Sequence, residues 1–194
     1  MKRIGVFICH CGSNISSVVD MEHVADSIRK IPNVFYTTHY VYMCSEPGQQ
    51  EIVNSTLEHK LDRIVVASCS PRLHEYTFQN TLERAGLNPY MLEIANIREQ
   101  CAWVHSSEKN QATDKAIELV RMKVAKVSQN IPLQRPTVSI NKRALVVGGG
   151  ITGMQVAIDI ADAGFPVVLV ERDSTIGGKM TMLDKTFPTL DCSG

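Results

Sequence analysis

The sequence predicts an α/β fold with parallel sheet structure, and two observations carry that prediction. In residues 1–130, short apolar runs alternate with amphipathic stretches, which is typical of layered α/β architecture. Further on, the apolar run 144–147 leads directly into glycines spaced as Gly148-x-Gly150-x-x-Gly153. Because buried parallel strands read as continuous apolar runs, both halves of the chain are expected to contain parallel strands.

The N-terminal half is expected to form strands separated by helices. The expected strands are residues 4–9, 34–43, 64–68 and 90–94. The expected helices are residues 18–31, 49–61, 75–85 and 110–129. Pro32 and Gly86 end the first and third of these helices, and the last one carries its apolar side chains on one face. Prolines then space a stretch that we interpret as a linker, so the predicted domains are 1–130 and 143–194 with a linker at 131–142.

Composition excludes several classes of protein. The chain of 194 residues balances 20 Lys and Arg against 20 Asp and Glu, so nothing indicates a nucleic-acid partner or an anionic membrane surface. No apolar run approaches the about 20 residues of a membrane span, and the run 4–9 is too short for the core of a signal peptide. We therefore expect a cytoplasmic protein. Its six cysteines then suggest metal ligands or redox groups more than disulfides.

Five of these cysteines stand at or after the ends of predicted strands: Cys9, Cys11, Cys44, Cys69 and Cys101. The carboxyl edge of an open parallel sheet is where ligands bind, so thiols from distant parts of the sequence are expected to converge there. Four thiolates suit an iron–sulfur cluster or tetrahedral zinc. The spacing is not the compact ferredoxin run, and an isolated cysteine is often a small buried hydrophobe, so both interpretations stay open.

The glycines after residue 147 predict a dinucleotide site. Gly148 suits the tight turn out of a strand, Gly150 lets backbone amides approach a pyrophosphate, and Gly153 lets the next helix pack closely. A helix is expected at 154–163 and a second strand at 167–170, followed by Glu171, whose carboxylate would bind ribose hydroxyls. The candidate cofactor-binding residues here are Gly148, Gly149, Gly150, Ile151, Thr152, Gly153, Glu171 and Arg172. The alternative is a sharp turn with no ligand.

Six segments together resemble a known family and span the whole chain. They are Cys9-His-Cys-Gly-x-Asn14, Met43-Cys-Ser45, Ala67-Ser-Cys-Ser-Pro71, Asn96-Ile-Arg-Glu-Gln-Cys-Ala-Trp-Val-His105, the glycine fingerprint and Asp184-Lys-Thr-Phe-Pro188. This combination closely resembles the iron–sulfur flavoprotein subunits, or A subunits, of the CoB–CoM heterodisulfide reductases of methanogenic archaea.

The resemblance implies an iron–sulfur flavoprotein in which an N-terminal domain precedes a Rossmann-like, thioredoxin-reductase-like FAD domain and ferredoxin-type modules. The flavin would bifurcate electrons from a hydrogenase or formate dehydrogenase partner toward ferredoxin and CoM-S-S-CoB, which other subunits of the reductase reduce. A homo-oligomer is expected at full length. The hard chemistry would belong to the cofactors, so no residue is expected to be catalytic.

Site residues follow from the same resemblance. Gly148, Gly150 and Gly153 would hold the FAD pyrophosphate and Glu171 the adenosine ribose, while the second glycine pair, in Gly177-Gly178-Lys179, would also approach the dinucleotide. Cys44, Cys69, Cys101 and one of Cys9 or Cys11 would ligate a [4Fe–4S] cluster.

The chain departs from the family at its end. A dinucleotide domain needs more strands than the two that follow Lys142. The family has a further cysteine just after the segment matching Asp191-Cys192-Ser193, and some methanogens replace it with selenocysteine, whose codon is normally read as stop. We therefore hypothesise a truncation at such a codon and an inactive fragment. Two alternatives stay open, namely an NAD(P)-binding oxidoreductase module and a non-catalytic zinc-binding or redox-sensing interaction domain.

Overall fold

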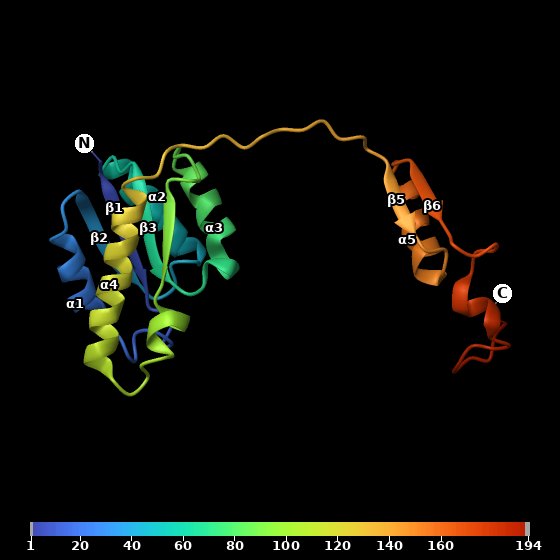
Figure 1. Ribbon diagram of the computed structural model, residues 1–194, viewed down its shortest axis with the longest axis horizontal. Coiled ribbons are helices and arrows are strands. Elements are labelled where there is room, and N and C mark those ends of the chain that lie inside the picture. Colours follow the sequence, from blue (N-terminus) through green and yellow to red (C-terminus); the bar gives the residue numbers. More distant parts are fainter. Residues whose placement is uncertain (1, 193–194) are drawn as a thin grey trace. The chain divides into compact units, whose positions relative to one another are not determined.

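The computed structural model describes residues 2–192 and divides the chain into two compact units. Unit 1 is Met1–Arg135 and unit 2 is Pro136–Gly194, and each contains parallel strands joined by helices (Figure 1). The predicted α/β fold class is therefore confirmed. Among the described residues, none of the helices combines the length and the apolar character that a membrane crossing requires.

Unit 1 is built on a parallel sheet with the strand order β2-β1-β3-β4. The strands are β1 (Ile4–Cys9), β2 (Val34–Tyr40), β3 (Arg63–Ser68) and β4 (Leu92–Asn96). The helices are α1 (Met21–Arg29), α2 (Glu46–Glu58), α3 (Pro71–Arg84) and α4 (Lys109–Val127). All three strand pairs are parallel, so the carboxyl ends of the strands share one edge.

Two apolar cores cover the two faces of this sheet. Ile4, Val6 and Ile8 of β1 pack with side chains of α1 and α4, whereas Phe7 and Cys9 pack with side chains of α2 and α3. This alternation is the period of two that a strand imposes. Because both faces are covered, β1 is buried along its whole length, which explains its continuous apolar sequence.

Serine caps set two helix starts that lie earlier than the predicted residues 49 and 75. Ser45 Oγ accepts a hydrogen bond from the Gly48 amide at the start of α2, and Ser70 Oγ accepts one from the Arg72 amide at the start of α3. Pro47 and Pro71 occupy the first turns, where proline loses no helical hydrogen bond. Conversely, α1 begins later than predicted, because Asp20 caps it by accepting from the His23 amide.

A π-helix, η1 (Arg98–Ala102), follows β4 and was not predicted. Its turn is closed by bonds from the Ala102 amide to the Ile97 carbonyl (3.1 Å) and from the Trp103 amide to the Arg98 carbonyl (2.9 Å). These i→i+5 bonds make a wider turn than an α-helix has. Side chains three residues apart in η1 therefore do not share a face as they would in an α-helix.

Residues 131–135 stay attached to unit 1. The Asn88 side-chain amide donates to the Leu133 carbonyl at 2.8 Å, and Arg135 forms an ion pair with Glu83 at 3.3 Å. Arg135 also lies over the Tyr90 ring, 6.0 Å from its centroid. The structural unit thus extends past the predicted boundary at 130, while the assignment of functional domains to 1–130 and 143–194 stays a prediction.

Unit 2 is a single βαβ arrangement made of β5 (Ala144–Val147), α5 (Ile151–Asp162) and β6 (Val167–Val170). The two strands pair in parallel from Ala144 opposite Val167 to Val147 opposite Val170, with the bounds that the sequence predicts. Helix α5 begins earlier than predicted because Gly150 serves as its N-cap. Within the described part of the chain α5 buries no side chain, so this unit has no enclosed core of the kind seen in unit 1.

Candidate cofactor sites

Four cysteines of unit 1 meet at the carboxyl edge of the sheet. A small, closed cavity of about 50 Å³ is lined by Cys9, Cys11, Tyr42, Cys44, Ser68, Cys69, His74, Phe78 and Arg98. The thiols come from the end of β1 and from the segments that follow β1, β2 and β3. The parallel topology thus brings together thiols that lie up to 60 positions apart in sequence (Cys9 and Cys69).

Backbone amides already point at one of these sulfurs. Cys9 Sγ accepts from the amides of Cys11 at 3.3 Å and Met43 at 3.4 Å. The turn that allows this contains two consecutive residues in the left-handed region, Cys11 at φ 53° and Gly12 at φ 62°. A Cβ on Gly12 would lie 2.7 Å from the Tyr42 hydroxyl, so this contact and the positive φ both favour glycine there. Such N–H donation to sulfur is one of the ways proteins tune cysteine-bound iron–sulfur clusters.

Burial favours the protonated form of three of the cavity thiols. Burial raises the pKa of Cys9 and of Cys44, and it raises the pKa of Cys69 to about 11 against the opposing charge of Arg98. A raised pKa argues against a free nucleophilic or redox-sensing thiolate, which needs a lowered one. It is compatible with metal binding, in which the metal displaces the thiol protons.

Ser68 supplies an independent indication of a ligand. Its side chain lines the cavity and its residue is 2% exposed, yet its hydroxyl has no hydrogen-bond partner within residues 2–192. Leaving such a group unsatisfied costs about 1–3 kcal/mol. A sulfur-rich group in the cavity would accept this bond, so the donor set fits a thiolate-bound cluster. As they stand, no three Cys, His, Asp or Glu side chains among the described residues surround a point that could hold a single metal ion.

Cys101 lies apart from the other four predicted ligands. It is fully buried in the core that α1 and α4 form on the sheet, and its thiol donates to the Ala112 carbonyl at 3.0 Å. The π-turn of η1 accounts for this placement, because it directs Cys101 into that core and Arg98 toward the cavity.

Arg98 is the site residue that sequence reasoning missed. Its Nη1 donates to Cys11 Sγ at 3.0 Å, while Nε and Nη2 donate to Glu99 Oε1 at 3.3 and 2.8 Å. The guanidinium also lies over the Trp103 ring, 4.9 Å from its centroid. The available signal was a cation four residues after the predicted strand 90–94, within the segment 96–105.

In unit 2, glycines shape a loop whose polar groups belong to the backbone. Gly148 has φ 102°, and a Cβ on Gly153 would overlap the Gly148 carbonyl oxygen. A Cβ on Gly150 would meet open space instead. Within the described residues no side chain caps α5, which leaves the amides of its first turn available. A helix N-terminus of this kind binds anionic groups such as a pyrophosphate.

The second glycine pair lies against the first. The Gly177 amide donates to the Gly149 carbonyl at 2.7 Å, and a Cβ on Gly178 would approach Gly150 Cα to 3.1 Å. Both residues have positive φ, at 112° and 55°. The structure therefore assembles the two glycine motifs into one backbone surface.

The predicted polar side chains of unit 2 are placed unequally. Glu171 lies beside the loop, where its carboxylate accepts from the Gly149 amide at 2.5 Å and from the Asp173 amide at 2.9 Å. The bond from the Asp173 amide and then the bond from the Gly149 amide lower the pKa of Glu171 and keep it ionised. Four other predicted site residues have exposed side chains, so they could take part only through their backbone or by contact with a bound ligand. They are Ile151, Thr152, Arg172 and Lys179.

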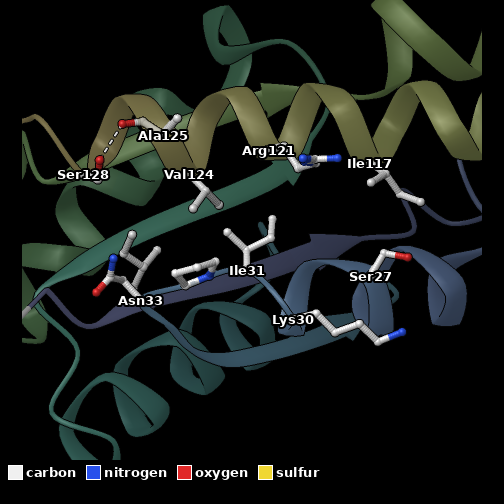
Figure 2. Close-up of a pocket in the computed structure, with 11 residues that line it drawn as sticks. Ser27, Lys30, Ile31, Asn33, Ile117, Arg121, Val124, Ala125 and Ser128 are labelled. Atoms are coloured by element: carbon white, nitrogen blue, oxygen red, sulfur yellow. Dashed lines mark hydrogen bonds between the residues drawn. The ribbon is translucent and has the colours of Figure 1, made fainter.

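A larger cavity of about 600 Å³ lies near the amino end of β1 and holds no thiol. Figure 2 shows α4 side chains such as Ile117 and Arg121 on one side and Ser27, Lys30 and Ile31 on the other. Arg121 is paired with Glu118 at 3.0 Å, and the remaining lining is mostly apolar. Neither set of predicted site residues contributes to it.

Comparison with known proteins identifies a family match in unit 2 and relatives along nearly the whole chain. Residues 144–187 match the model of the family described as FAD dependent oxidoreductase. Over 98% of its length the chain is 53% identical to one of the A-type iron-sulfur subunits of CoB–CoM heterodisulfide reductase from Methanopyrus kandleri. It is 54% identical to the A-type protein of the H2:CoB–CoM heterodisulfide,ferredoxin reductase of Methanothermobacter thermautotrophicus. It is 47% identical to the corresponding A-type protein of the ferredoxin/F420H2-dependent CoB–CoM heterodisulfide reductase of Methanosarcina acetivorans.

The alignments cover nearly the whole of this chain but only part of each relative. The chain spans 29% of the first two of these proteins and 24% of the third. The predicted resemblance is confirmed, since the chain is a homologue of the A subunits of these oxidoreductases. Less than a third of their length is represented here.

Proposed function

We propose that this chain forms part of the iron–sulfur flavoprotein subunit of a heterodisulfide reductase, with a [4Fe–4S] site in unit 1 and part of an FAD site in unit 2. The observation that carries the proposal is the convergence of Cys9, Cys11, Cys44 and Cys69 on one buried cavity. The names of the relatives, several of which are iron-sulfur subunits, support it.

In unit 1 the four cavity thiols would be the ligands, including both Cys9 and Cys11. Cys101 remains a predicted ligand, but its contact with Ala112 favours a core role. A bound cluster would supply one-electron transfer. The chain's own contribution is to fix the thiols at the ends of buried strands, to exclude water, and to direct the amides of Cys11 and Met43 and the Ser68 hydroxyl toward sulfur.

In unit 2 the backbone of Gly148–Gly153 would hold the FAD pyrophosphate at the start of α5, with Gly149, Ile151 and Thr152 contributing amides. Glu171 would accept bonds from the ribose hydroxyls with the lone pairs that its two amide bonds leave free. Gly177, Gly178, Lys179 and Arg172 would border the same surface. Bound flavin would supply the chemistry that divides electron pairs.

For the longer protein, we propose electron bifurcation at FAD toward ferredoxin and CoM-S-S-CoB. The names of the relatives refer to ferredoxin, F420H2 and H2, which supports electron exchange with such partners. Other reductase subunits and a hydrogenase or formate dehydrogenase would complete the path, and the protein would form a homo-oligomer in the cytoplasm.

The deciding experiment compares two cysteines by iron content. The 194-residue chain is reconstituted anaerobically with iron and sulfide, and bound iron, sulfide and flavin are quantified in the wild type, Cys69→Ser and Cys101→Ser. We expect Cys69→Ser to lose most of its iron and Cys101→Ser to retain it. Iron loss in Cys101→Ser as well as in Cys69→Ser would favour the ligand set that the resemblance implies. A colourless wild type that binds zinc instead would favour the interaction-domain alternative, and binding of NAD(P) without FAD would favour the nicotinamide module.

A further inference from the structure

Building on the proposed cluster site, we propose that Arg98 is a positioning residue that fixes a positive charge against the Cys11 sulfur and thereby raises the reduction potential of the site.

The contact is direct and its geometry is restrained. Arg98 Nη1 lies 3.0 Å from Cys11 Sγ, and the other guanidinium nitrogens are bonded to Glu99. The Arg98 side chain is 15% exposed and Trp103 covers one face of the guanidinium. A side chain with this many fixed partners does not swing into solvent, so its charge stays at the sulfur.

Arg98 is also the one residue with a permanent charge among the described residues that line the cavity. An arginine guanidinium is not deprotonated in proteins, so this charge is permanent. Its field acts across a poorly solvated cavity, where charges are screened much less than in water.

Reduction of a thiolate-bound cluster adds one electron and breaks no bond, so the reduced form is more negative by one charge. A fixed cation that donates to a ligand sulfur stabilises the reduced form more than the oxidised form. Hydrogen bonds to the sulfurs, net charge and solvent exposure are the main factors by which a protein sets the reduction potential of such a cluster. Glu99 opposes Arg98, because its carboxylate neutralises part of the guanidinium charge at 2.8 Å.

This arrangement predicts that substitutions at the adjacent residues Arg98 and Glu99 shift the midpoint potential of the cluster in opposite directions. Arg98→Met should lower the midpoint potential of the cluster, and Arg98→Lys should recover part of the loss because it keeps the charge. Glu99→Gln should raise the potential. Arg72→Met is the matched control, since Arg72 also follows the carboxyl edge of the sheet but its side chain is exposed and does not line the cavity.

The test is a redox titration with dithionite as reductant, followed by EPR, on the reconstituted 194-residue chain and its four variants at equal iron content. An Arg98→Met potential equal to that of the wild type overturns the proposal, as does a shift of the same size in Arg72→Met. Should Arg98→Met fail to hold iron, Arg98→Lys and Glu99→Gln decide, and potentials that do not move apart in opposite directions overturn it. A wild type without iron overturns the cluster site itself, which separates failure of the proposed function from failure of the role of Arg98.

Discussion

The two units present candidate cofactor sites of opposite construction. In unit 1 the groups are four side-chain sulfurs that come from three separate segments of the chain. In unit 2 they are mainly backbone amides of one contiguous loop, with a second glycine pair laid against it. A side-chain site depends on the sheet that brings its segments together, whereas a backbone site depends on the conformation of a few consecutive residues.

The cores of the two units differ accordingly. Unit 1 buries apolar side chains on both faces of its sheet. Unit 2 leaves Leu145, Val147, Ile158, Val168 and Val170 exposed. The thiol site is therefore supported by apolar cores on both faces of its sheet. The glycine loop depends on local backbone conformation and on the pairing of β5 with β6.

The largest expected effect is on the free energy of unfolding, which a substitution in the core of unit 1 should lower far more than one in unit 2. Phe78 is fully buried and lines the thiol cavity, so Phe78→Ala should lower the free energy of unfolding of unit 1 by about 3–5 kcal/mol. Ile158 is 53% exposed, and Ile158→Ala should change the stability of unit 2 by less than about 0.5 kcal/mol. Hydrogen exchange of peptides from each unit, measured across a urea series, reports both values. Equal losses in the two units would contradict the contrast.

The next effect concerns the glycine loop. Gly153→Ala places a methyl group on the Gly148 carbonyl, and overpacking of this kind costs about 1–3 kcal/mol, so both loop and flavin binding should be lost. Gly150→Ala meets open space in the loop itself and should keep the pairing of β5 with β6 while weakening FAD binding. Flavin fluorescence titration of the two variants makes the comparison. Wild-type affinity in Gly150→Ala would show that the pyrophosphate does not approach this residue.

A smaller expected effect on stability depends on pH and contrasts a buried carboxylate, Glu93, with an exposed one, Glu118. Glu93 of β4 is 7% exposed and pairs with Lys126 at 2.6 Å and Lys123 at 3.0 Å. Burial alone would raise the pKa of Glu93, but hydrogen bonds from Lys126, Lys123 and Asn130 lower it below its ordinary value of 4.5. The folded pKa is therefore below the unfolded one, so the stabilisation is present above about pH 4.5 and is lost as the pH falls through the folded value.

Glu93→Gln should accordingly destabilise unit 1 by about 1–2 kcal/mol at pH 7, and the difference from the wild type should shrink below pH 4.5. Urea unfolding followed by Trp103 fluorescence measures this, because the single tryptophan lies in unit 1. Glu118→Gln removes an exposed pair and is the control, with an expected change under about 0.5 kcal/mol. A pH-independent difference for Glu93→Gln would contradict the assignment.

Local causes explain what the sequence predicts well. The apolar runs 144–147 and 167–170 became β5 and β6 with the predicted bounds, because each run is delimited by residues that end a strand. The convergence of Cys9, Cys44 and Cys69 follows from the rule that parallel strands share a carboxyl edge. Prolines were less informative, since Pro47 and Pro71 lie in the first turns of α2 and α3 and the predicted starts were too late.

The remaining features depend on tertiary structure. An isolated sequence gives no sign that residues 98–102 close a turn with i→i+5 bonds, and that turn decides which side chain faces the cavity. It directs the predicted ligand Cys101 into the core and the unpredicted Arg98 toward Cys11. The Ser68 hydroxyl could not be identified either, because its lack of a partner among the described residues is a property of the folded environment.

The short tail 131–135 has a practical consequence for dissecting the chain. An expressed fragment that stops at residue 130 would remove the carbonyl to which Asn88 donates, the partner of Glu83 and the cation over Tyr90. A fragment that stops at Arg135 keeps all three, and the exposed residues 136–142 beyond it offer a protease accessible backbone. The appropriate boundary for an expressed fragment is therefore after Arg135. A fragment 1–135 contains the thiol site together with the contacts that residues 131–135 make with the rest of unit 1.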